Sequence, residues 1–178
     1  LWFERMRDNG WTAPEWPRRW SAPLTGAGVL LQAGGWLGGV PALVVLGGAL
    51  AASGVALFLW QAALWFRHRA RPQLDPSLRQ VVAALALLGA ALLAGVAALL
   101  TGRPQLVAAY GLLLIVGWLG VLVAAIYARI LPFLTWMHRY SPRVGEKGLP
   151  KVGDMVPVPW VRIASTCWIA GIAVLATA

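Results

Sequence analysis

The sequence predicts an all-α fold: a polytopic transmembrane helical bundle of about five spans, preceded by an interfacial amphipathic segment. Hydrophobic residues make up 60% of the 178 residues and charged residues 12%, whereas soluble domains carry about 25% charged residues. Long charge-free stretches recur along the chain, with arginines beside them. These stretches lack the alternation of a transmembrane β-barrel, and a backbone in lipid must satisfy its own hydrogen bonds. The spans are therefore expected to be helices.

Residues 1–23 are predicted to be the interfacial segment. Aromatic residues alternate there with arginines: Trp2, Phe3, Trp11, Trp16 and Trp20 with Arg5, Arg7, Arg18 and Arg19. Indole rings favour the headgroup layer, where arginines reach lipid phosphates. A signal peptide would instead show one apolar stretch and a small-residue cleavage site. The alternative to a plain membrane anchor is docking on a soluble or membrane partner.

Residues 20–66 contain no charge and are too long for one span, because roughly 20 apolar residues cross the hydrocarbon layer. The turn formers and proline at residues 38–41 predict a break, which gives spans 24–40 and 42–66. With this hairpin, every lysine and arginine except Arg103 lies on one side of the membrane. A single tilted span would move the four N-terminal arginines across, against the positive-inside rule.

Three further apolar stretches each predict one span. They are residues 80–101, residues 106–128 with an interfacial extension to 138, and residues 159–178. Residues 139–158 then form a cytoplasmic loop. The positive-inside rule predicts a cytoplasmic N-terminus, in a bacterial inner membrane. Because the chain begins at Leu1 and ends within an apolar run, we expect it to be processed or to belong to a longer protein.

Small residues four positions apart predict close helix contacts in the bundle. The pairs are Gly34–Gly38, Gly35–Gly39 and Ala91–Gly95. The embedded polar residues Gln32 and Gln61 are expected to be packing contacts.

The basic residues beside the spans are candidate lipid-binding residues. They are Arg67, Arg69, Arg71, Arg129 and Arg139. Because the charges flank apolar runs, their expected partner is anionic lipid such as cardiolipin, not nucleic acid. The alternative for the first three is a topology determinant. Arg129 is expected at the cytoplasmic boundary, with Pro132 bending the helix beyond it; the alternative is that Arg129 neutralises a ligand carboxylate or an acid on a partner.

The two histidines, His68 and His138, are candidate ligands of haem or a chlorophyll-type pigment, since haem iron accepts imidazole. Both follow predicted spans and lie beside arginines, which is equally typical of ordinary interfacial residues. The lone Cys167 excludes a multi-cysteine metal site, and no base accompanies it in sequence for nucleophilic catalysis. No Asp, Glu, Lys or His occurs in the middle of a predicted span, which argues against a carboxylate-driven pump.

Residues 131–145, LPFLTWMHRYSPRVG, continue through Lys147 and Pro150 to Met155. This stretch resembles one in uncharacterised bacterial polytopic membrane proteins, some of them distant relatives of haem–copper oxidase subunit I. That superfamily binds its haems and copper through histidines within the spans, and none is present here. The resemblance therefore implies a non-catalytic remnant, or a portion whose ligands lie elsewhere.

Three functions are consistent with these observations. The first is a non-catalytic accessory subunit of a respiratory or photosynthetic membrane complex, with other membrane subunits as partners. The second is a fragment of a haem-binding electron-transfer protein. The third is a small transporter or channel-like bundle that uses Gln32 and Gln61.

Overall fold

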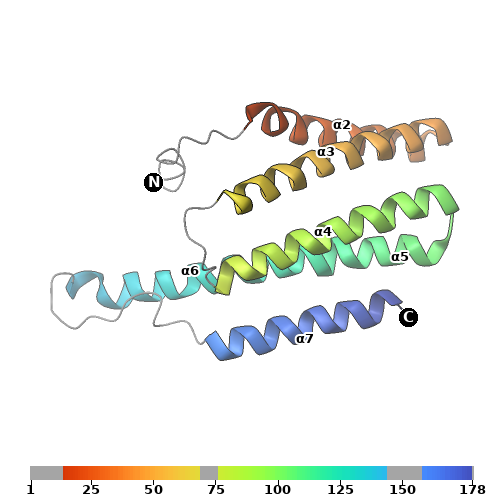
Figure 1. Cartoon of the computed structure of the whole chain (residues 1–178). Coiled ribbons are helices and arrows are strands. Elements are labelled where there is room, and N and C mark those ends of the chain that lie inside the picture. Colours follow the sequence, from red (N-terminus) through yellow and green to blue (C-terminus); the bar gives the residue numbers. More distant parts are fainter. Residues whose placement is uncertain (1–13, 69–75, 144–157, 178) are drawn as a thin grey trace. The chain divides into compact units, whose positions relative to one another are not determined.

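The computed structural model describes residues 14–68, 76–143 and 158–177, and these are helical apart from short connections (Figure 1). The elements in chain order are α2 (Glu15–Leu37), α3 (Pro41–Arg67), α4 (Pro76–Thr101), α5 (Pro104–Leu112), the π-helix η1 (Leu113–Gly120), α6 (Val121–Tyr140), the 3-10 turn η2 (Ser141–Arg143) and α7 (Val158–Thr177). The predicted all-α class is confirmed for this part of the chain.

Three helices in the described residues are long and apolar enough to cross a membrane: Pro41–Arg67, Ser77–Thr101 and the continuous helix Pro104–Tyr140. They correspond to three of the five predicted spans. The other two, 24–40 and 159–178, fall on α2 and α7, which are not in this group. In α2, two arginines, Glu15, Thr25 and Gln32 dilute the apolar residues.

The predicted boundaries shift at two places. Helix α2 begins at Glu15, so residues 15–23 of the predicted interfacial segment continue into the first predicted span; residues 1–13 lie outside the described residues. Helix α6 continues through Pro132 to Tyr140. The predicted loop 139–158 therefore starts in helix, and its residues 144–157 lie outside the described part of the chain.

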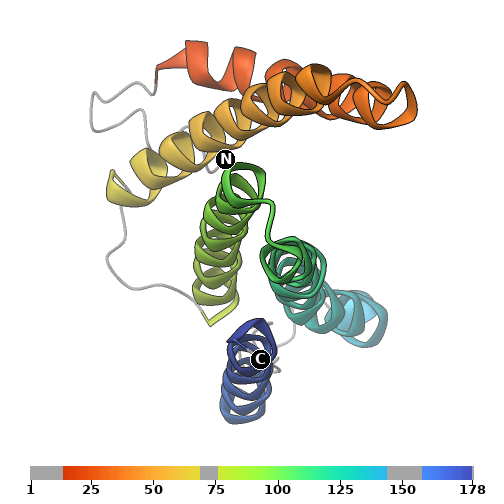
Figure 2. The same cartoon turned by 90° about the vertical axis from the view of Figure 1, so that its right-hand side faces the viewer.

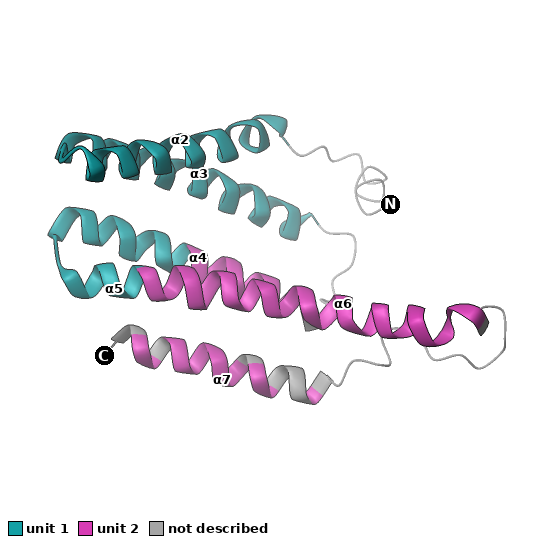
Figure 3. Ribbon diagram, turned by 180° about the vertical axis from the view of Figure 1, so that it is seen from behind, with its two compact units in different colours: residues 1–73, 89–110 teal, residues 74–88, 111–178 magenta. Residues whose placement is uncertain are grey.

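The chain divides into two compact units (Figure 3). Unit 1 comprises Leu1–Gln73 and Gly89–Tyr110, and unit 2 comprises Leu74–Leu88 and Gly111–Ala178. Helix α4 contributes to both units, because the division falls within it.

The centre of unit 1 is the hairpin of α2 and α3, which run side by side (Figures 1 and 2). The break predicted at residues 38–41 is confirmed. Gly39 adopts a φ of 64°, which is strained for residues with a Cβ, and Val40 N–H donates to the Gly35 carbonyl at 2.9 Å. Pro41 then opens α3, at a position that needs no backbone donor.

Glycines spaced seven residues apart bring the backbones of α2 and α3 together. On α2 they are Gly28 and Gly35, and on α3 they are Gly47 and Gly54. A Cβ at Gly28 would collide with the Ala51 backbone and lie 2.7 Å from the Gly47 carbonyl oxygen. A seven-residue repeat keeps small residues on one contact face between two helices.

The four-residue spacing in the sequence predicted close contact but not its pattern. Gly34 has no atom within 4 Å of a built Cβ, and Gly38 meets only its own segment, at the Gly34 carbonyl and the Val40 side chain. Gly35 is the one member of those two pairs that packs on α3, with a built Cβ 2.7 Å from Val44 N. The contact therefore follows the seven-residue repeat instead.

The rest of unit 1 is the second half of α4, most of α5 and the connection between them. Gly102, with a φ of 67°, allows the chain to reverse after α4, and Arg103 N–H donates to Thr101 Oγ1 at 3.4 Å. The Tyr110 ring lies over Gly95, 3.0 Å from a built Cβ. The pair Ala91–Gly95 thus marks a real contact face, since Ala91 is fully buried.

Unit 2 has a small apolar core. Its buried residues are Ala84, Val121 and Ile172, from α4, α6 and α7. They are surrounded by four half-buried residues: Leu87, Leu113, Trp118 and Leu122.

We predict that Gly47→Ala destabilises the protein, because its Cβ would meet the backbone of Gln32 and force the helices apart. The expected loss is about 1–3 kcal/mol of unfolding free energy, measured by denaturation with sodium dodecyl sulfate in mixed micelles followed by circular dichroism. The matched control is Gly34→Ala on α2, which has open space around its Cβ. Equal stability of the two variants would contradict the close backbone contact.

Candidate functional site

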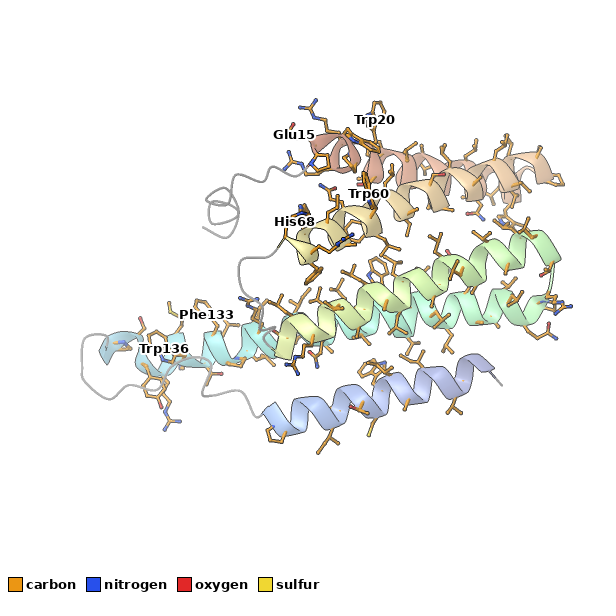
Figure 4. The ribbon with its side chains drawn as sticks, in the orientation of Figure 1. Glu15, Trp20, Trp60, His68, Phe133 and Trp136 are labelled. Carbon is orange, nitrogen blue, oxygen red and sulfur yellow. The ribbon has the colours of Figure 1, made fainter. Side chains whose placement is uncertain are left out.

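The end of the α2–α3 hairpin away from its turn combines aromatic and basic side chains. We call it the open end, formed by residues 15–20 of α2 and 60–68 of α3 (Figure 4). The Trp16 and Trp60 rings lie with centroids 5.5 Å apart at an interplanar angle of 47°. Both rings are about half exposed, and so is Trp20. Large, exposed indoles in contact with each other are typical of the membrane headgroup level.

The charges at the open end are predominantly positive. Arg18, Arg19 and Arg67 are exposed, and Glu15 pairs with Arg19 at 3.0 Å, one helical turn away. This exposed pair contributes little to stability. Arg67 lies in the last turn of α3, where a cation interacts favourably with the helix dipole.

His68 follows Arg67 and ends α3. Its Nδ1 lies 3.0 Å from the Leu64 carbonyl oxygen, and its backbone N–H donates to the same carbonyl at 3.1 Å. A carbonyl can only accept, so this contact fixes the tautomer with a proton on Nδ1. Haem-ligating histidines make this kind of second contact too, so the geometry is compatible with ligation and equally with a helix cap.

The other predicted site residues lie on α6 in unit 2 or outside the described residues. Arg129, His138 and Arg139 are exposed on α6, whereas His68 and Arg67 belong to unit 1. Arg69 and Arg71 fall outside the described part of the chain. The Arg139 guanidinium lies 5.8 Å from the centroid of the Tyr140 ring, which in turn lies 6.3 Å from that of Trp136.

The π-helix η1 joins α5 to α6 within one continuous helix, and sequence reasoning missed it. Trp168 of α7 donates its indole N–H to the Val116 carbonyl of η1 at 3.2 Å. Gly120 makes room for that indole, because a built Cβ there would lie 2.9 Å from Trp168 Cζ2. A π-helix weakens the regular hydrogen-bond ladder and often marks a functional or packing site. Here it presents a carbonyl to a neighbouring helix.

No signal in the sequence identifies a π-helix reliably. The two glycines at which neighbouring side chains pack on it, Gly117 and Gly120, can however be read from the sequence. Gly117 is buried against the Leu87 side chain, 3.5 Å from a built Cβ. Two glycines three residues apart on η1 thus receive side chains from α4 and α7, on different faces.

Metal chemistry finds no support in the described residues, which hold no group of three or more His, Cys, Asp and Glu side chains able to bind an ion together. Cys167 is a free thiol, exposed on α7.

Comparison of the chain with protein-family models, curated proteins and solved structures gave no match. Function is therefore inferred from the chemistry and arrangement of its own residues.

We predict that Trp168→Phe loosens α7 in unit 2, because the phenyl ring keeps much of the apolar contact but leaves the Val116 carbonyl without its indole donor. Interhelical hydrogen bonds of this kind contribute about 0.6–2 kcal/mol. Hydrogen–deuterium exchange of residues 158–177 is expected to accelerate accordingly, by roughly 3- to 30-fold.

The control is Trp36→Phe, which alters an indole that is 72% exposed on α2. Unchanged exchange in the Trp168 variant would show that the bond to Val116 does not hold α7.

Proposed function

We propose that this chain is a non-catalytic accessory subunit of a larger membrane complex, built from five helical spans with a cytoplasmic N-terminus. The observation that supports it best is that little of the surface of its apolar helices is buried within the chain. In each of the three helices long and apolar enough to span, only 17% of the most apolar window is buried within the chain. Such helices need lipid or other subunits against most of their surface.

The dimensions of the hairpin support a complete crossing by α2 as well as α3. Trp36 near the turn and Trp16 at the open end are 20 positions apart on one helix. At 1.5 Å per residue they are separated by about 30 Å, the thickness of the hydrocarbon layer. Tryptophans at this spacing would lie in both interfaces, and the charged residues of α2, Glu15, Arg18 and Arg19, all lie within one turn of Trp16 and far from Trp36.

Helix length also favours an interfacial Arg129. The helix Pro104–Tyr140 has 37 residues, about 55 Å, which exceeds the roughly 40–45 Å of a bilayer with its headgroups. Arg129 lies 26 positions after Arg103, about 39 Å along the axis. The two arginines therefore fit the two headgroup regions, and neither needs to enter the hydrocarbon.

The embedded polar groups favour packing over transport. Gln61 is only 4% exposed, and Gln32 is half-buried with its amide nitrogen 3.6 Å from a Cβ built at Gly48. Both glutamines are thus enclosed among helices of unit 1, where they can contribute interhelical hydrogen bonds. The resemblance of residues 131–155 suggests an electron-transfer complex, respiratory or photosynthetic, in a bacterial inner membrane.

We predict the following topology by cysteine labelling in a Cys167→Ser background. An impermeant maleimide added to intact spheroplasts should label Val40→Cys, at an exposed position of the turn, and Arg103→Cys. It should label Arg18→Cys and Arg67→Cys only after permeabilisation, because the hairpin returns the chain to the cytoplasmic side. Labelling of Arg18→Cys and Arg67→Cys from opposite sides would disprove the crossing by α2.

We predict that gentle purification of the chain from its native membrane yields other membrane polypeptides in fixed proportion. Co-purification should survive His68→Ala and His138→Ala, since both histidines are exposed at helix ends, away from the apolar surfaces of the spans. A haem-type absorption band that belongs to this chain alone, and that disappears in one of these variants, would instead support the electron-transfer fragment. A chain that purifies without partners and carries solute flux in vesicles would support the transporter.

A further inference from the structure

The hairpin is asymmetric in charge, and this asymmetry bears on the lipid around it. The open end carries three arginines and one glutamate, Glu15. At the turn, residues 38–41 carry no charge at all. Aromatic residues occur at both ends, since Trp36 is largely exposed near the turn. The two ends therefore differ in charge, and the open end also carries more aromatic residues.

The arginines of the open end differ in how they are paired. Arg19 is held by Glu15 at 3.0 Å. Within the described residues no acidic group is paired with Arg18 or Arg67, and both are exposed. Their charges therefore attract anions from outside the chain.

Because α2 and α3 run antiparallel, the side chains of Arg18 and Arg67 reach toward a similar depth in the membrane. Side chains on an α-helix lean toward its N-terminus. The N-terminus of α2 is at the open end and that of α3 is at the turn. Arg18 therefore leans outward from the membrane and Arg67 leans back toward it, which brings both guanidinium groups toward the phosphate level.

We infer that the open end of the hairpin binds the headgroup phosphates of anionic phospholipids. Arg18 and Arg67 contact the phosphates, and the indoles of Trp16 and Trp60 pack at the glycerol and carbonyl level beside them. The cytoplasmic leaflet supplies such lipids. This inference rests on the proposed cytoplasmic orientation of the open end, but it does not depend on the accessory-subunit role, because it requires no partner protein.

The test uses the full chain in a neutral detergent, titrated with phosphatidylglycerol or phosphatidylcholine and followed by native mass spectrometry. Phosphatidylglycerol should bind more tightly than phosphatidylcholine. Each of Arg18→Gln and Arg67→Gln should weaken phosphatidylglycerol binding by about 5-fold, and the double variant by about 30-fold. The charge-preserving pair Arg18→Lys and Arg67→Lys should retain most of the binding.

The control Arg103→Gln removes the same net charge at the α4–α5 turn and should leave phosphatidylglycerol binding unchanged. Circular dichroism verifies that each variant keeps its helix content. If a glutamine variant does not fold, the comparison of the two lipids on the unchanged chain still tests the inference. Unchanged binding in the double glutamine variant, or equal binding of the two lipids, would overturn the inference. Displacement of phosphatidylglycerol by millimolar inorganic phosphate would point to a free-anion site instead.

Discussion

The close approach of two helix backbones is the constraint on which unit 1 depends. Between α2 and α3 there is no room for a Cβ at Gly28 or Gly47, so the contact consists of backbone against backbone. In lipid, apolar side chains gain little from meeting each other, because lipid tails are as apolar as leucine. Dispersion contacts between smooth surfaces then carry the association, and the glycines create those surfaces.

The helices of unit 2 associate in a different way. Its core of Ala84, Val121 and Ile172 is small, and one directional bond, from Trp168 to the Val116 carbonyl, joins α7 to η1. A regular α-helix uses its carbonyls internally. In η1 the Val116 carbonyl accepts a bond from another helix, and Gly120 gives the indole access to it.

The ion pair and the contacts between aromatic rings described above lie at the ends of helices. In the described residues, the ion pair Glu15–Arg19 and the tilted pair of Trp16 and Trp60 rings lie at one end of the hairpin, and Arg139 and Tyr140 end α6. The helix middles contribute apolar contacts and enclosed amides such as Gln61. A helical membrane protein needs this distribution, because the charges must stay in water while the apolar surface stays in lipid.

The sequence by itself determined the helical class, the hairpin turn and the distribution of charge. These depend on local properties: Gly39 and Pro41 dictate the backbone around them, and long apolar runs leave lipid as the only suitable solvent. The tertiary structure decided which residues meet. The seven-residue glycine contact, the contact of the Trp16 and Trp60 rings and the bond from Trp168 to the π-helix each join elements distant in sequence. Such pairings depend on the rotation and register of two helices, and no single segment specifies either.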